Sequence, residues 1–510
     1  MLERIWKLIR RIFGPFFTLI MLIGLFLGVV SYYLAQWVID TWGLLTMDEI
    51  VFHLKVPLEG TNEDMVWEAV NLCVPVAIVA VLTLLIVWIA VRKRKITKYL
   101  VWIGVMSFAV FLVKHSVDYI WEELSVDEYL KSQKTQSTFI QDNYVDPRSV
   151  QITFPEQKRN LIYIFLESME TTYASKEVGG GANANYIPEL TEIAQNNISF
   201  SNTEQLGGGY VAPGASWTMG AMFAQTSGLP LAIPIDGNAM DTQQEFLPEI
   251  KSLGDILDEQ GYQQVLMIGS EAEFGGRKNY FTQHGNYEIW DYNTAIETGK
   301  IPPEYRVFWG YEDEKLFEYS KEKLTELSMS GQPFNFTMLT VDTHFEDGYV
   351  CPQCIAQYGS QYANVISCAS HQVAEFVSWI QQQPFYANTT IIITGDHLTM
   401  QSAGSNFFYE IDPKYDRRIY NAIINPAVLP VNSVNREFNT MDMFPTTLAS
   451  LGVNIEGNYL GLGVNLFSDQ PTISEQYGRD MVNKELQRGS SFFDNFTKGI
   501  VVTDENSTEK

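Results

Sequence analysis

Three residues of the types that bind metal ions follow two apolar runs of the chain. Glu167 comes directly after the run 160–166, and Asp396 and His397 come directly after the run 389–395. Both runs are typical of strands buried on both faces of a sheet. Ligands of open α/β sheets bind outside the carboxyl ends of the strands. We therefore expect the three side chains to meet around one ion; carboxylates that merely end their strands are the structural alternative.

Two further apolar runs end in polar residues and extend this pattern. The run 334–341 is followed by His344, and the run 263–269 is followed by Arg277. Such strand-like runs alternate with stretches of helical periodicity, at 187–196, 247–260, 313–329 and 371–383. This alternation predicts an α/β domain with a mostly parallel sheet and helices on both faces. The polar residues at the strand ends would then form one site.

The first quarter of the chain is typical of a membrane anchor. Apolar runs at 13–38, 66–91 and 99–120 are each long enough to cross a bilayer, which takes about 20 helical residues. The loop 92–98 is basic, whereas the loop between the first two runs is acidic. By the positive-inside rule the N-terminus and the basic loop lie in the cytoplasm. Everything after about residue 121 is then expected on the extracytoplasmic side of the plasma membrane.

These observations divide the chain into four parts. We expect an anchor of three transmembrane helices at 1–120, a linker at 121–155, an α/β domain at 156–470, and a C-terminal extension and tail at 471–510. The formal net charge of −26 argues against a nucleic-acid partner, which would require a basic surface.

Three of the four cysteines lie close together in sequence. Cys351 and Cys354 have the spacing of a zinc knuckle, but no fourth ligand is evident. A disulfide within the trio that Cys368 completes is favoured if the domain lies outside the cytoplasm. The sequence leaves the pairing open.

Several spaced motifs resemble one known family. The segments are 47–54, 161–170, 213–218, 340–344 and 394–397. Together they look like the membrane-anchored phosphoglycerol transferases of the alkaline-phosphatase/sulfatase superfamily, which include the lipoteichoic acid synthases. The resemblance implies a sulfatase-like extracytoplasmic domain and one Mn²⁺ (or Mg²⁺) ion. It also implies phosphatidylglycerol as the donor, a glycan or polyglycerolphosphate acceptor, and a threonine nucleophile.

The resemblance also assigns roles to single residues. Glu167, Asp396 and His397 match the metal ligands of the family, while Arg277 and His344 match residues that hold the phosphate or the glycerol head. Trp217 falls in the same substrate-binding region. The residue types suit these roles, because hard cations prefer oxygen ligands, an added imidazole favours manganese, and a guanidinium fits a phosphate.

The nucleophile position departs from the family pattern. Aligned on Pro213, Gly214 and Trp217, it falls on Ala215, whose methyl group cannot attack phosphorus. Three interpretations follow: a deliberate Thr→Ala change, replacement by Ser216, or a natural non-catalytic relative. The complete set of surrounding site residues favours the first. Thr218 is a weaker candidate, because family members that possess the nucleophile also carry Ser or Thr there.

Other functions remain as alternatives. A phosphoethanolamine transferase of the same superfamily would bring a denser zinc site than three ligands. A sulfatase would carry a Cys/Ser-x-Pro-x-Arg motif, which is absent near 213–218. The third alternative is a non-catalytic membrane protein that binds lipid head groups.

Overall fold

The computed structural model describes residues 2–42, 47, 50–51, 63–231, 245–401 and 405–497. Most of the motif 47–54 and the end of the C-terminal tail therefore lie outside the described residues. The chain divides into two compact units, one made of Met1–Leu44 and Asn62–Glu128 and the other of Leu45–Thr61 and Tyr129–Lys510. The domain limits inferred from the sequence stay predictions.

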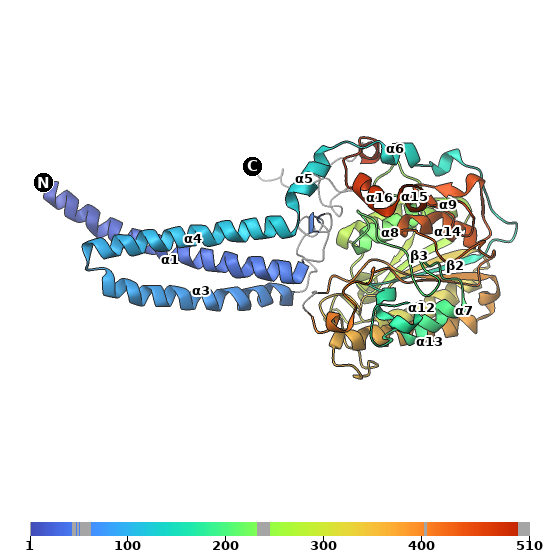
Figure 1. Ribbon diagram of the computed structural model, residues 1–510. Coiled ribbons are helices and arrows are strands. Elements are labelled where there is room, and N and C mark those ends of the chain that lie inside the picture. Colours follow the sequence, from blue (N-terminus) through green and yellow to red (C-terminus); the bar gives the residue numbers. More distant parts are fainter. Residues whose placement is uncertain are drawn as a thin grey trace, which may run out of the picture. The chain divides into compact units, whose positions relative to one another are not determined.

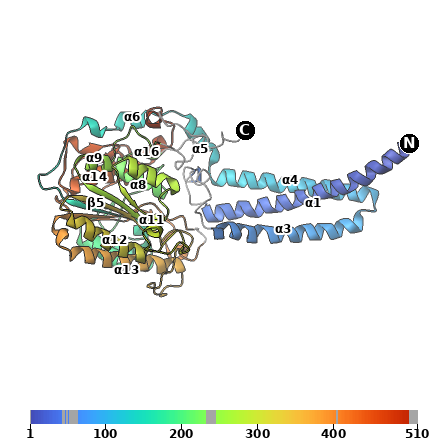
Figure 2. The same cartoon turned by 180° about the vertical axis from the view of Figure 1, so that it is seen from behind.

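The first unit consists of three long helices that pack side by side (Figures 1 and 2). They are α1 (Leu2–Trp42), α3 (Glu63–Val91) and α4 (Lys95–Glu123), and each contains a candidate membrane span. Gly28 of α1 permits a close approach, because an added Cβ would lie 3.0 Å from the Cα of Ala109 on α4. Large apolar side chains cover the outside of the helices, as helices in hydrocarbon require. The three predicted apolar helices are confirmed, and the chain is a membrane protein.

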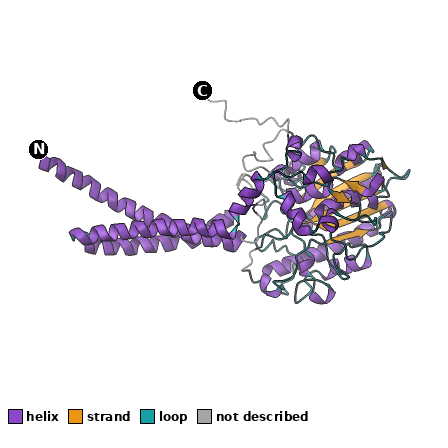
Figure 3. Ribbon diagram, turned by 45° about the horizontal axis from the view of Figure 1, so that its top comes forward, coloured by secondary structure: helices purple, strands orange, loops and turns teal. Residues whose placement is uncertain are grey.

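The second unit is built on a six-stranded sheet with the order β4-β3-β5-β2-β6-β7. All neighbours pair in parallel except β7, which runs antiparallel to β6. The strands are β2 (Asn160–Leu166), β3 (Gln263–Ile268), β4 (Glu288–Trp290), β5 (Phe334–Leu339), β6 (Thr389–Gly395) and β7 (Asn421–Ile424). Figure 3 shows these strands in orange between layers of helices. The α/β fold with a mostly parallel sheet is thus confirmed.

The two faces of the sheet bury separate hydrophobic cores. In β2, Leu161, Tyr163 and Phe165 belong to one core, while Ile162 and Ile164 belong to the other. This alternation follows from the two-residue period of a strand. Helices α8 (Thr218–Ser227), α9 (Leu253–Glu259) and α14 (Met443–Ser450) lie on the first face, and α7 (Pro188–Asn196), α12 (Asp313–Met329) and α13 (Gln361–Gln381) on the second (Figure 1).

The helix predictions differ from the structure at two places. Helix α9 is shorter than the predicted 247–260, because the capping box of Ser252 and Asp255 starts it. Helix α13 begins well before the predicted residue 371, after the N-cap Ser360.

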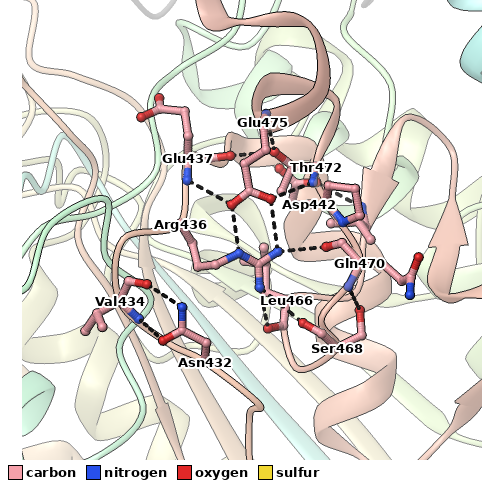
Figure 4. Close-up of polar contacts among 12 residues, drawn as sticks. Asn432, Val434, Arg436, Glu437, Asp442, Leu466, Ser468, Gln470, Thr472 and Glu475 are labelled. Carbon is pink, nitrogen blue, oxygen red and sulfur yellow. Dashed lines mark hydrogen bonds and ion pairs between the residues drawn. The ribbon is translucent and has the colours of Figure 1, made fainter.

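The remaining elements surround the sheet. The range 121–155 contains α5 (Val126–Lys134), α6 (Phe139–Asn143) and β1 (Ile152–Thr153). The other elements are α10 (Arg277–Gln283), α11 (Tyr292–Glu297), α15 (Ile473–Tyr477), α16 (Arg479–Leu486), β8 (Asn454–Ile455), β9 (Tyr459–Leu460) and β10 (Gly463–Val464). The extension after residue 470 is attached to the domain by a partly buried ion pair between Arg436 and Glu475, 2.8 Å from Nε to Oε1 (Figure 4).

Gly395 at the end of β6 is fixed by a close backbone contact. An added Cβ would lie 1.9 Å from the carbonyl oxygen of Met169. We therefore expect Gly395→Ala to lower the free energy of unfolding by about 1–3 kcal/mol, as overpacking does. Denaturant unfolding of the detergent-solubilised protein measures the change.

Gly359→Ala is the matched control, because nothing lies within 4 Å of a Cβ added at that exposed glycine. Its effect should stay within about 0.5 kcal/mol. Equal stability of both variants would contradict the close contact.

Candidate active site

Neighbouring strands bring the three predicted metal ligands together. Strands β2 and β6 pair in parallel with Leu166 opposite Gly395, so Glu167 and Asp396 follow at the same edge of the sheet. Ligand atoms of Glu167, Asp396 and His397 all lie within 4.8 Å of one another. All three residues are at most 2% exposed. The edge of the sheet therefore holds two buried carboxylates and one imidazole.

Backbone contacts direct these ligand atoms toward a common point. Asp396 Oδ1 accepts hydrogen bonds from the backbone N–H groups of Ser168 (2.8 Å) and His397 (2.7 Å). His397 Nδ1 lies 2.7 Å from the carbonyl oxygen of Leu398, so the ring donates there and presents the lone pair of Nε2. That Nε2 lies 3.4 Å from both Glu167 Oε1 and Asp396 Oδ2. Two carboxylate oxygens and an imidazole nitrogen fit a manganese or magnesium ion.

The pKa values of Glu167 and Asp396 reflect the close approach of two carboxyl groups in a buried site. Burial raises the pKa of Glu167, but the opposing effects of His397, His344 and the Ser168 hydroxyl bring it to about 2. Burial and the neighbouring Glu167 raise the pKa of Asp396 to about 8. The two carboxylates therefore cannot both ionise easily without a compensating cation.

The loop after β5 is connected to the same edge. Thr340 Oγ1 accepts the N–H of Glu167 at 3.0 Å, and Thr343 Oγ1 donates to the carbonyl of Glu167 at 2.5 Å. Ser168, next to the ligand, adopts a left-handed φ of 53°, which is uncommon outside glycine. These contacts fix Glu167 from both sides. Sequence reasoning missed the two threonines, although both lie in the motif 340–344.

Thr218 brings a hydroxyl group to the ligands. It is the first residue of α8, and its Oγ1 lies 3.3 Å from Glu167 Oε2 and 3.4 Å from His397 Nε2. Ala215, the predicted nucleophile position, is fully buried in the hydrophobic core, and Ser216 is half-buried in the turn before the helix. The Thr218 hydroxyl thus contacts Glu167 and His397, and Ala215 belongs to a hydrophobic core, while the assignment of the nucleophile stays a prediction.

The predicted substrate residues lie around this hydroxyl site. Arg277 is the first residue of α10, and the charges of Glu167 and Asp396 act on it, although burial lowers its pKa to about 10. Its Nη2 donates to the carbonyl of Glu271, while its buried Nε has no hydrogen-bond partner among the described residues. A buried N–H donor of this kind is available to an anionic ligand.

His344 and an aromatic neighbour complete the surroundings. The His344 ring packs against Trp309 with a centroid distance of 4.5 Å, and burial lowers its pKa. The buried indole Nε1 of Trp309 has no hydrogen-bond partner among the described residues. Trp217 is buried directly before α8. Trp309 carries no signal in the sequence, because it follows no predicted strand.

The fold and the site together define a class of protein. A mostly parallel α/β sheet with acidic and imidazole ligands at its strand ends matches the family model of the sulfatases over residues 159–453. This match covers more than half of the chain, which therefore belongs to the sulfatase family.

Individual relatives give a more specific comparison than the family model does. Phosphoglycerol transferase I of Escherichia coli O127:H6 is 31% identical over 390 residues, 75% of this chain and 48% of that protein. The same enzyme of Escherichia coli strain K12 / MC4100 / BW2952 gives the same values. The chain thus spans about half the length of the curated relatives it matches. The crystal structure of the lipoteichoic acid synthase LtaP from Listeria monocytogenes matches this chain with a TM-score of 0.52 and 15% sequence identity. The match covers 72% of this chain and 100% of the LtaP chain. That likeness shows the fold, and the resemblance seen in the motifs is confirmed.

A third buried acid, Glu170, joins the turn after β2 to the loop after β6. Glu170 is fully buried and accepts hydrogen bonds from the Thr399 backbone (2.8 Å) and from Arg417 Nε (2.9 Å). We expect Glu170→Gln to lower the free energy of unfolding by about 3–5 kcal/mol, because it leaves the Arg417 charge without its partner. Equilibrium unfolding in denaturant gives the value.

Arg479→Gln serves as the comparison, since its ion pair with Asp416 is more exposed. That variant should cost no more than about 1 kcal/mol. A Glu170→Gln protein as stable as Arg479→Gln would show that the buried pair does not brace the loop.

Proposed function

We propose that this chain transfers a phosphoglycerol group from phosphatidylglycerol to a hydroxyl of a glycan or polyglycerolphosphate acceptor. The contact of the Thr218 hydroxyl with Glu167 and His397 carries the proposal. The name and 31% identity of phosphoglycerol transferase I support the choice of the transferred group. Three apolar helices support a donor drawn from the membrane in which the chain lies.

Glu167, Asp396 and His397 would hold the metal ion, which we propose to be Mn²⁺ (or Mg²⁺). When bound, such an ion lowers the pKa of an adjacent hydroxyl and neutralises charge on phosphoryl oxygens. Arg277 and His344 would hold the phosphate and the glycerol head through their N–H groups. Thr218 also begins a helix of 10 residues, whose positive end favours a developing negative charge on its oxygen.

The reaction proceeds as two displacements at one phosphorus atom. Thr218 Oγ1 forms a bond to phosphorus while the bond to the diacylglycerol oxygen breaks, and the hydroxyl proton ends on that oxygen. The acceptor hydroxyl then attacks the same phosphorus and breaks the Thr218 ester, and its proton returns to Thr218. Division into two steps is the general advantage of a covalent intermediate. A hydroxyl beside the candidate metal ligands supports this enzymatic proposal over the non-catalytic alternative.

Substitutions within 215–218 test the nucleophile. We expect Thr218→Val to reduce Mn²⁺-dependent release of diacylglycerol from phosphatidylglycerol by about 10³-fold or more, because the attacking oxygen is gone. Thr218→Ser should keep part of the activity. Mass spectrometry of the protein mixed with donor alone should find the phosphoglyceryl group on the peptide that contains Thr218.

Ser216→Ala and Ala215→Thr are the matched controls. Ser216→Ala should stay within a few-fold of the parent, and Ala215→Thr should gain no activity, because its hydroxyl would enter an apolar core. An active Thr218→Val protein, or a Ser216→Ala protein without activity, would sink the assignment of Thr218.

The orientation of the chain is a second part of the proposal. We place the basic loop 92–98 in the cytoplasm and the α/β domain on the extracytoplasmic side of the plasma membrane. A membrane-impermeant maleimide should therefore label Gln382→Cys in intact cells but Lys93→Cys only after permeabilisation. Cells with the parent chain give the background from its own cysteines. The reverse pattern would place the domain inside the cell.

A further inference from the structure

Three cysteine thiols meet on the second face of the sheet. Cys351 and Cys354 lie in the segment between β5 and α13, and Cys368 lies within α13. The Cys351 Sγ is 3.5 Å from Cys354 Sγ and 3.8 Å from Cys368 Sγ. All three sulfur atoms lie within 4.8 Å of one another. Cys351 and Cys368 are buried, and Cys354 is half-buried.

These separations suit a shared metal ion. Zinc–sulfur bonds of about 2.3 Å in a tetrahedral arrangement place the sulfur atoms about 3.8 Å apart. A disulfide would use only two of the three sulfur atoms. The third thiol would then lie in close contact with the sulfur–sulfur bond. One ion satisfies all three sulfur atoms at once, and the Cys-x-x-Cys spacing of 351 and 354 is that of a metal knuckle.

The surrounding hydrogen bonds favour thiolate at the central sulfur. The Cys351 sulfur lies within hydrogen-bond reach of the Cys354 and Cys368 sulfurs, and the backbone N–H groups of Gln353 and Cys354 are directed at it. Gln372 Nε2 adds weaker contacts, 3.4 Å from Cys368 Sγ and 3.7 Å from Cys351 Sγ. Donors directed at sulfur stabilise the anion, and the thiolate is the form that binds metal.

Two buried carboxyl groups, Asp313 and Asp342, interact electrostatically with Cys351. Asp313 and Asp342 are almost fully buried, and Asp342 Oδ1 accepts the backbone N–H of Asp313 at 3.2 Å. Burial first, and then other effects that include the charge of Cys351, raise the pKa of both carboxyl groups. Asp342 Oδ2 has no hydrogen-bond partner in the described part of the chain. These raised pKa values favour the protonated, neutral form of both groups, and a cation at the sulfurs would offset the charge of Cys351 that contributes to this effect.

We propose that Cys351, Cys354 and Cys368 bind one Zn²⁺ ion as three thiolates, at a site separate from Glu167, Asp396 and His397. Each thiol releases one proton to solvent as its sulfur–zinc bond forms, and no electron is transferred. Water takes the fourth position. The ion ties the segment that carries His344 to α13, and it does not depend on the proposed transferase activity.

Metal analysis of the purified full-length protein tests the site. The protein is prepared in detergent without oxidant, with Asp396→Asn as the background so that the carboxylate site does not contribute. We expect one equivalent of zinc, lost in Cys351→Ser and Cys368→Ser and retained in Cys73→Ser, whose cysteine lies in α3. Replacement of zinc by Co²⁺ should give a thiolate-to-cobalt charge-transfer band in the Asp396→Asn background and in the Cys73→Ser protein, but not in Cys351→Ser or Cys368→Ser.

The variant Cys354→His is a control that distinguishes loss of a zinc ligand from failure of the protein to fold. Because imidazole is also a zinc ligand, this variant should keep the zinc and shift the cobalt spectrum. Absence of zinc from the Asp396→Asn background would overturn the proposal. So would a disulfide that joins Cys351 to Cys354 or Cys368, found by peptide mapping without reductant. Transferase activity is not part of this readout, so failure here leaves the assignment of Thr218 standing.

Discussion

The parallel pairing of β2 with β6 is the constraint on which the site depends. Its register places Leu166 opposite Gly395 and so forces Glu167 and Asp396 into one buried space. Like charges in a low dielectric repel strongly, and neither carboxylate reaches water. The pairing is stable because the apolar residues of both strands are buried on both faces of the sheet. Hydrophobic burial thus supports a local concentration of negative charge that a cation would relieve.

Other contacts keep that arrangement from relaxing. The threonines after β5 bind the backbone of Glu167 on both its N–H and C=O sides. Gly395 lets β6 approach the Met169 carbonyl, and Glu170 joins the turn after β2 to the loop after β6 through Thr399. Each contact spans segments that lie more than 150 residues apart in the sequence. The candidate ligands are therefore positioned by the strand ends, which is what precise metal coordination would require.

The sequence was sufficient for the parts of the fold that depend on periodicity. Apolar runs located β2, β3, β5 and β6, and residue types at their ends identified Glu167, Asp396 and His397. The short strands β4 and β7 were not predicted, because strands of 3 or 4 residues show too little hydrophobic periodicity. The sequence also predicted no role for Trp309 or Glu170, because their roles depend on contacts with distant segments of the chain. Long-range contacts of this kind leave no mark on local composition.

The proposed nucleophile shows how the geometry of a turn can point to a different residue than the alignment of a short motif. The segment before α8 turns at Gly214, whose φ of 78° directs Ala215 into the apolar core. A threonine at 215 would bury its hydroxyl among apolar side chains, and burial of an unpaired hydroxyl is unfavourable. The hydroxyl of Thr218, by contrast, has a polar neighbour, because the start of the helix holds it beside Glu167. The proposed role of Thr218 would therefore explain the alanine at 215 without a lost threonine.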